Sequence, residues 1–378
     1  MNATAVVDRV RARLAVQPAP PTRAGVAALV REEAGGLLGD DEVLLAVSRA
    51  VDELAGAGPL EPLLRRAGVT DVLVNGPDEV WVDTGAGLER SDLRFPDEEA
   101  VRRLAVRLAA AAGRRLDDGM PWVDAGLPDG TRLHAVLPPV AEGCTRLSLR
   151  VLRRCALGFG DLVAAGAVPA PADDLLRGLV RARAAFLVTG GTGSGKTTLL
   201  SALLELVPPD ERVVVCEDAA ELTPRHPHVV RLLGRPANVE GAGEVTLRDL
   251  VRQALRMRPD RVVVGEVRGA EVVDLLAALN TGHEGGAGTL HANRPSDVPA
   301  RLEALGVAAG LGRAAVHAQA AAGIDVHVRR TARGRQVDEI GVLRRAGELV
   351  TVEPGWCADG GPCPGAARLR ELVAGGPP

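Results

Sequence analysis

One glycine-rich stretch carries most of the chemistry that this sequence offers. It consists of Gly190, Gly191, Thr192, Gly193, Ser194, Gly195, Lys196, Thr197 and Thr198, and it matches G-x-x-x-x-G-K-[ST] at every fixed position. Glycines let a backbone curl until successive N–H groups point at phosphate oxygens, and a following helix adds positive potential at its N-terminus. Lys196 is then placed to reach the β- and γ-phosphates, and the Thr197 hydroxyl to ligate Mg²⁺. We predict a loop that binds ATP with Mg²⁺.

The basic residues support this prediction independently. The chain has 45 lysines and arginines, and Lys196 is the single lysine among them. A compact ammonium cannot be replaced by a planar guanidinium in this loop, whereas arginine serves as well as lysine at most surface positions. The position of the single lysine therefore indicates a chemical requirement.

Two further apolar runs end in carboxylates. Glu266 follows the run 261–265, and Glu217 follows the run 212–216. Ligands bind at the carboxyl ends of the strands of an open parallel sheet, so both side chains are expected near the phosphate loop. We predict that Glu266 is the catalytic base and holds the Mg²⁺-bound water, with Glu217 in support, although either carboxylate fits the role of base.

Two histidines flank a glycine-rich turn further along the chain. His291 is expected at the end of a strand, where it is placed to sense the γ-phosphate, and His283 precedes the turn. They are eight residues apart, without the i, i+4 spacing of a helical metal pair, so no zinc site is indicated.

The segments around these residues alternate between strand and helix, which predicts an α/β fold with a parallel sheet. Expected strands cover 184–189, 212–216, 261–265, 286–290, 324–330 and 336–343, and expected helices cover 197–206, 246–258, 270–280, 297–305 and 313–322.

The preceding half reads as a smaller α/β region. A helix over 41–54 is expected to bury Leu44, Val47, Val51 and Leu54, and strands are expected over 69–74, 79–83, 132–137 and 145–152, with a helix over 97–112. The predicted division is a helical N-terminal region (1–57), an α/β domain (58–155), a linker (156–172), a P-loop domain (173–355) and a disordered tail (356–378).

Composition narrows the possible partners and surroundings. The net charge is −4 and aromatic residues make up 2%, so we expect no nucleic-acid partner. No apolar run is long enough to span a membrane, and no basic and apolar leader opens the chain. The five cysteines form no C-x-x-C pair. We expect a cytoplasmic protein.

The chain resembles the type II/type IV secretion ATPase superfamily over about residues 55–345. Four stretches carry the resemblance: the glycine loop, the two strands that end in carboxylates and the histidine segment. They occur in the order of that family's Walker A, Asp, Walker B and His boxes. The stretches 58–62, 69–76 and 290–293 are most similar to the tight-adherence (Flp-type) pilus branch. Gly288-Thr289 stands where the family has a Thr-Thr pair, and the chain has no four-cysteine metal element.

The resemblance implies a RecA-like core and a smaller N-terminal domain whose arginines reach the bound phosphates. The matching positions are Arg132 and Arg150, and Arg268 is a candidate for coupling between subunits. It further implies a homo-hexameric motor at the inner face of the cell membrane, docked on a platform protein, that hydrolyses ATP to drive pilus assembly or protein secretion. The alternatives are a conjugation-type ATPase that moves DNA and a nucleotide-dependent switch or scaffold with little turnover.

Overall fold

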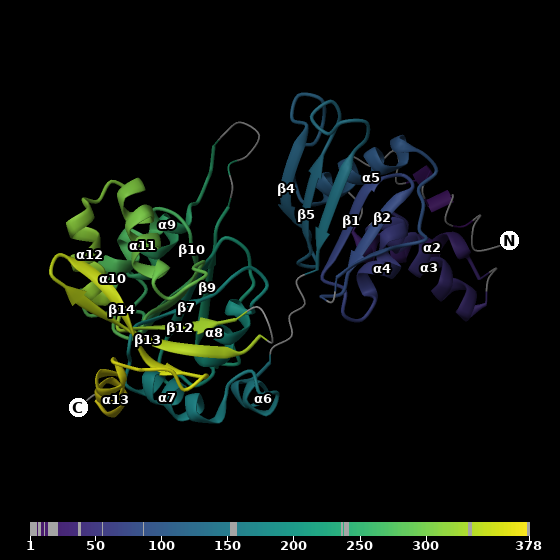
Figure 1. Cartoon of the computed structure of the whole chain (residues 1–378). Coiled ribbons are helices and arrows are strands. Elements are labelled where there is room, and N and C mark those ends of the chain that lie inside the picture. The colour runs from purple at the N-terminus through teal and green to yellow at the C-terminus, as the bar shows by residue number, and fades with distance from the viewer. Residues whose placement is uncertain are drawn as a thin grey trace. The chain divides into compact units, whose positions relative to one another are not determined.

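A computed structural model of the chain describes residues 22–36, 39–54, 56–85, 87–151, 157–235, 242–331 and 335–375, together with residue 237 and isolated positions before residue 14. The chain divides into two compact units, Met1–Arg153 and Arg154–Pro378, which are described separately (Figure 1). In the described part of the chain, no helix combines the length and the apolar character needed to cross a membrane.

The first unit contains helices α2 (Arg23–Ala34) and α3 (Asp40–Leu54), which contribute to a small apolar core together with Val6 and Val10. The α3 helix is confirmed, but the prediction that it buries Leu44 is wrong, because this side chain is 62% exposed. The predicted Val47, Val51 and Leu54 do pack, partly buried, against this core, and Ala46 and Ala50 are its fully buried α3 members, so the stripe is centred on small side chains that the prediction left out. The earlier part of the predicted helical region lies mostly outside the described residues.

An antiparallel sheet follows, with the strand order β3-β2-β1-β6-β5-β4. Its strands are β1 (Asp71–Gly76), β2 (Glu79–Asp83), β3 (Leu88–Arg90), β4 (Trp122–Gly126), β5 (Arg132–Val136) and β6 (Arg146–Arg150). Alternate residues are buried, which is the period of a sheet with one covered face. Helix α5 (Glu98–Ala111) buries the predicted stripe of Val101, Leu104, Ala105 and Leu108, and the Asp97 carboxylate caps its first turn.

The second unit is built on a mixed sheet with the strand order β14-β13-β12-β7-β11-β10-β8-β9. The strands from β12 to β9 are parallel, and β13 and β14 run antiparallel at one side. Their bounds are β7 (Phe186–Thr189), β8 (Val213–Glu217), β9 (Val229–Leu233), β10 (Arg261–Val267), β11 (Ala287–Leu290), β12 (Val326–Arg330), β13 (Val337–Ala346) and β14 (Leu349–Cys357).

Helices cover both faces of this sheet (Figure 1). One face packs against α6 (Phe159–Ala164), α7 (Ala170–Arg181), α8 (Lys196–Leu204) and α13 (Ala366–Ala374). The other packs against α9 (Leu247–Ala254), α10 (Glu271–Leu279), α11 (Asp297–Ala308) and α12 (Arg313–Gly323). All strands and helices predicted for the P-loop domain are present. The carboxyl ends of the predicted strands that run parallel, β7, β8, β10, β11 and β12, lie along one end of the sheet.

Two predicted boundaries are wrong. The expected linker contains α6 and the start of α7, and Phe159 and Leu162 are buried in the core of the second unit. The expected disordered tail contains the end of β14 and helix α13, whose Leu369 is 1% exposed. In both segments a few large apolar residues are buried in the core of the second unit, although the surrounding sequence is rich in glycine, proline and alanine.

Candidate phosphate-binding site

The glycine-rich loop connects β7 to α8, as the sequence predicts. Gly190 has a φ of 150° and lies so close to the Arg330 carbonyl that a Cβ atom would sit 2.3 Å from its oxygen. Gly195, with a φ of 83°, is the N-cap of α8. Residues with side chains are strained at such angles, so both glycines are required by the path of the backbone.

The Lys196 ammonium lies inside this loop. Its Nζ donates to the carbonyl oxygens of Gly190 (3.1 Å) and Gly191 (3.0 Å), and burial lowers the pKa of the side chain. Ser194 is fully buried, and its hydroxyl has no hydrogen-bond partner among the described residues. A cation, an unpartnered hydroxyl and a helix N-terminus converge here, and this donor set fits a phosphate group.

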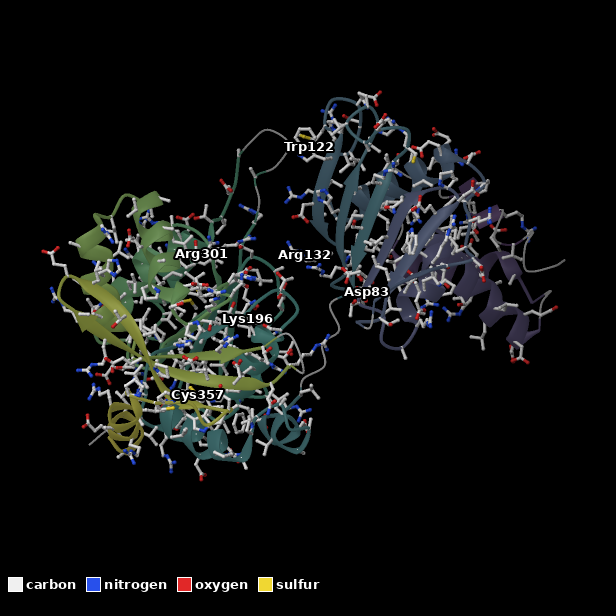
Figure 2. All side chains as sticks on the ribbon, viewed as in Figure 1. Asp83, Trp122, Arg132, Lys196, Arg301 and Cys357 are labelled. Carbon is white, nitrogen blue, oxygen red and sulfur yellow. The ribbon has the colours of Figure 1, made fainter. Side chains whose placement is uncertain are left out.

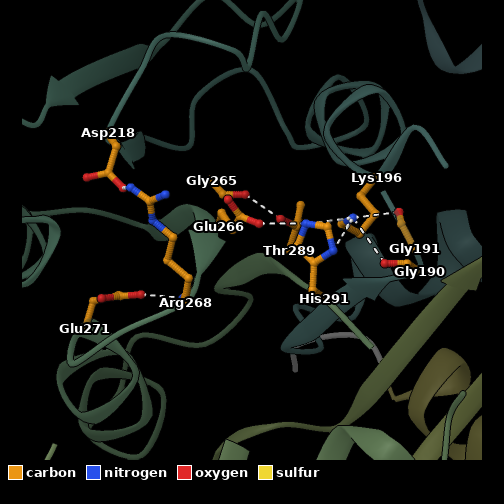
Figure 3. Close-up of polar contacts among 10 residues, drawn as sticks. All are labelled: Gly190, Gly191, Lys196, Asp218, Gly265, Glu266, Arg268, Glu271, Thr289 and His291. Carbon is orange, nitrogen blue, oxygen red and sulfur yellow. Dashed lines mark hydrogen bonds and ion pairs between the residues drawn. The ribbon is translucent and has the colours of Figure 1, made fainter. Parts of the chain in front are cut away.

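His291 joins the lysine to the first predicted carboxylate (Figure 3). Its Nε2 lies 2.8 Å from Glu266 Oε1, and Lys196 Nζ lies 3.5 Å from Nδ1, the ring nitrogen that accepts when Nε2 carries the proton. Burial and the charge of Lys196 lower the pKa of His291, so the ring is neutral at pH 7 and donates to Glu266. Strand β11 ends at Leu290, as expected, whereas β10 runs past its expected end at residue 265, through Glu266 to Val267.

Thr289 fixes the backbone between these two strands. Its hydroxyl donates to the Gly265 carbonyl at 2.6 Å, which ties β11 to β10 directly before Glu266. Gly288 lies against Val264, Val267 and Leu187, and a Cβ there would approach the Val264 carbonyl to 3.0 Å. The glycine in place of a threonine therefore fits a tight strand pairing.

Glu217 is placed differently from Glu266. It is 3% exposed, and its Oε1 accepts the backbone N–H groups of Glu221 (3.1 Å) and Leu222 (2.8 Å). Its Oε2 is buried without a partner among the described residues, and it packs against Gly265. Burial raises its pKa to about 7. The carboxyl is thus a structural neighbour of the β10 end and does not contact Lys196 in the described hydrogen bonds.

Arg268 follows the Glu266 strand and forms an ion pair with Asp218. Its backbone N–H donates to Glu271 at 2.6 Å, at the start of α10.

Thr197 and Thr198 lie half-buried in the first turn of α8, and Thr192 is exposed in the loop. Among the described residues, no group of three or more His, Cys, Asp or Glu side chains could hold a metal ion. Thr197 and Glu266 therefore fit only a metal that is also held by phosphate and water.

His283 is not part of this arrangement. It follows α10 and precedes β11, at the amino end of the strand that carries His291 at its carboxyl end. Its Nδ1 is buried without a partner in the described structure. A role at the phosphates does not fit this position.

Arg132 and Arg150 lie side by side in the first unit. They are directly opposite each other in the β5–β6 register, so both side chains leave the same face of the sheet. Arg150 donates to Asp71 at 3.0 Å. Arg132, which is labelled in Figure 2, lies 3.6 Å from Asp124. The structure brings together the two arginines that the resemblance singled out. No pattern in the sequence pointed to Arg330, one arginine among many, which contacts the phosphate loop.

Comparison with known proteins gives consistent matches. A family model described as "Type II/IV secretion system protein" matches residues 53–338. A putative conjugal transfer protein of Mycobacterium tuberculosis is 62% identical over 346 residues, covering 89% of this chain and 98% of the relative. The type IV secretion system protein PtlH of Bordetella pertussis is 36% identical over 256 residues, covering 62% and 75%.

A solved structure shares the fold. The Legionella pneumophila ATPase DotB aligns with a TM-score of 0.51 at 18% identity, covering 83% of this chain and 85% of that one. The predicted fold, a RecA-like P-loop core with a smaller α/β N-terminal domain, is confirmed.

Proposed function

The chain belongs to the type II/IV secretion system protein family, and from that premise we propose that it is a Mg²⁺-dependent ATP hydrolase that drives pilus assembly or protein secretion. The observation that carries this proposal is the contact of both Lys196 and Glu266 with His291. It groups a phosphate-binding cation, a carboxylate and a neutral imidazole at the carboxyl end of the sheet, where ligands bind in such folds.

Each residue has a proposed role. The loop N–H groups and Lys196 bind the phosphates of ATP, and Thr197 and Glu266 hold Mg²⁺. The ion, when bound, neutralises charge on the phosphate oxygens. His291 keeps the Glu266 carboxylate oriented toward the loop and responds to the γ-phosphate.

Two carboxylates are candidates for taking the proton from the attacking water. Glu217 has a pKa of about 7, which suits a base at neutral pH. Its Oε1, however, is engaged by two backbone N–H groups, whereas Glu266 pairs with the histidine beside Lys196. We assign the base to Glu266 and a supporting role to Glu217.

The proposed working form is a homo-hexameric ring at the cytoplasmic face of the cell membrane, docked on an inner-membrane platform protein. Arg132 and Arg150 would neutralise charge that develops on the γ-phosphate during hydrolysis. Their shared position on one face of the first unit's sheet supports a joint role. Arg268 is proposed to couple neighbouring subunits. Similarity to the tight-adherence branch favours pilin as the cargo.

A conjugation-type motor is the second candidate, because the 62% identical relative carries the name of a putative conjugal transfer protein. A net charge of −4 and an aromatic content of 2% weigh against direct contact with DNA. Copurification of a membrane platform protein with pilin, rather than with DNA-processing proteins, would distinguish the two cargoes.

The test compares Glu266→Gln with Lys196→Ala. We expect Glu266→Gln to bind Mg-ATP, to hydrolyse it at least about a hundredfold more slowly than the wild type, and to shift to a ring-sized native mass with nucleotide. Lys196→Ala should not bind nucleotide. Normal turnover by Glu266→Gln would move the base to Glu217, and a wild-type protein that binds ATP without turnover would indicate a switch.

A further inference from the structure

Arg330, the last residue of β12, is a buried cation behind the phosphate loop. It is 4% exposed, and burial lowers its pKa to about 10, so the side chain stays charged at neutral pH. Among the described residues, no carboxylate forms an ion pair with it. The other deeply buried arginine, Arg261, has such a partner, because its Nε donates to Glu211 at 2.6 Å.

Among the described residues, the side-chain hydrogen bonds of Arg330 go to backbone oxygen atoms. Its Nη1 donates to the Gly195 carbonyl at 2.8 Å, and its Nε donates to the Arg335 carbonyl at 3.0 Å. The Gly195 carbonyl also accepts the first helical bond of α8, from Leu199 at 3.0 Å. The guanidinium therefore touches the point where the phosphate loop becomes a helix.

The backbone of the same residue supports the other end of the loop. A Cβ atom on Gly190 would lie 2.3 Å from the Arg330 carbonyl oxygen, so Gly190 packs directly against this carbonyl. One residue thus contacts both the first and the last glycine of the phosphate loop. Its charge lies beside the N-terminus of α8, which adds positive potential of its own.

A buried charge is costly unless an opposite charge compensates it, and here the described protein supplies none. We propose that Arg330 is a positioning residue whose standing positive charge completes the phosphate-binding loop, and that nucleotide phosphate is its counter-ion. This inference rests on the proposed nucleotide-binding function. It implies that Arg330 acts through the loop and the local field, and not by direct contact with the reacting atoms.

The experiment measures the binding of Mg-ADP and of inorganic pyrophosphate by calorimetry on the full chain. Arg330→Gln removes the charge and keeps a hydrogen-bond donor, Arg330→Met removes both, and Arg330→Lys keeps the charge. The matched control is Arg329→Met on the same strand, since Arg329 pairs with Asp338 at 3.2 Å and does not contact the loop in the described hydrogen bonds.

We expect both neutral variants to bind pyrophosphate and Mg-ADP at least about tenfold more weakly, whereas Arg330→Lys and Arg329→Met stay within about threefold of the wild type. Added salt should weaken pyrophosphate binding more in the wild type than in Arg330→Gln, because the variant lacks the attraction between Arg330 and the anion that salt screens. The ligand-free neutral variants should melt at or near the wild-type temperature, because a desolvated charge has been removed.

Wild-type pyrophosphate affinity in a folded Arg330→Gln or Arg330→Met would overturn the inference. The inference would also be overturned if Arg330→Lys bound pyrophosphate as weakly as the neutral variants and the salt dependence were unchanged in all of them. Arg330 would then act only through its hydrogen bonds to the backbone, and not through its charge. A wild-type chain that binds neither ligand would refute the proposed function itself, which is a separate outcome.

Discussion

Replacing the buried carboxyl of Glu217 with an amide should remove part of the pH dependence of the second unit's stability. Burial raises the pKa of Glu217 from 4.5 to about 7. The folded state therefore favours the protonated acid, and this stabilisation is fully present below pH 4.5 and is lost as the pH rises to about 7. At about 1.4 kcal/mol per pKa unit, the whole effect is about 3 kcal/mol, of which about 2 kcal/mol falls between about pH 5.5 and about pH 8.

The assay can isolate the second unit within the full chain. The sequence has three tryptophans, and Trp81 and Trp122 lie in the first unit, whereas Trp356 packs against the core of the second. With the first two replaced by phenylalanine, Trp356 fluorescence during urea unfolding reports the second unit alone. Unfolding free energies are then compared across this pH range.

In this background, the unfolding free energy of the protein with Glu217 should fall by about 2 kcal/mol, relative to that of Glu217→Gln, as the pH rises across this range. The amide places a buried N–H₂ group where Oε2 has no described partner, which adds a constant offset but no slope. Glu348→Gln, at an exposed turn position, controls for the substitution itself. Parallel pH profiles for wild type and Glu217→Gln would refute the reasoning that burial holds this carboxyl protonated.

Two further predictions concern the outer parts of the chain. Arg132→Ala and Arg150→Ala should each lower ATP turnover at least about tenfold, because each removes a guanidinium proposed to neutralise phosphate charge, while stability changes little since their ion pairs are exposed. Unchanged steady-state kinetics would return both to an ordinary surface role. Leu369→Ala should cost about 3 kcal/mol by leaving a cavity under α13, measured by the Trp356 signal, and exposed Leu349→Ala should have little effect.

The sequence predicted the centre of the second unit because each functional residue there is tied to a strong local pattern. Lys196 follows a glycine loop, Glu266 ends an apolar run in β10, and His291 directly follows β11. Parallel strands bring such residues to one end of the sheet by topology alone, so the contact between Glu266 and His291 could be anticipated in outline.

The elements that the sequence did not predict lie where contacts with distant residues, and not local composition, determine the structure. Strand β4 buries alternate residues, Val123 and Ala125, but the apolar Trp122 is exposed and a glycine closes the strand, so polar and apolar residues alternate only weakly in the sequence. The end of β14 and helix α13 lie among glycines and prolines, and only contacts with distant residues order them. Arg330 could not be found for a similar reason, because nothing local distinguishes it from Arg329 beside it on the strand.

Helices α7 and α13, from the two ends of the second unit, pack against each other, and Val373 lies directly over Gly178. Both helices approach the amino end of the sheet, where residues 182–185 and Gly375 line a common pocket. The last described residue of the chain is therefore opposite the phosphate loop across the length of β7. A surface tether or fluorophore joined after α13 would therefore be attached at the end of the second unit's sheet away from the phosphate loop, so nucleotide binding can be tested on immobilised protein.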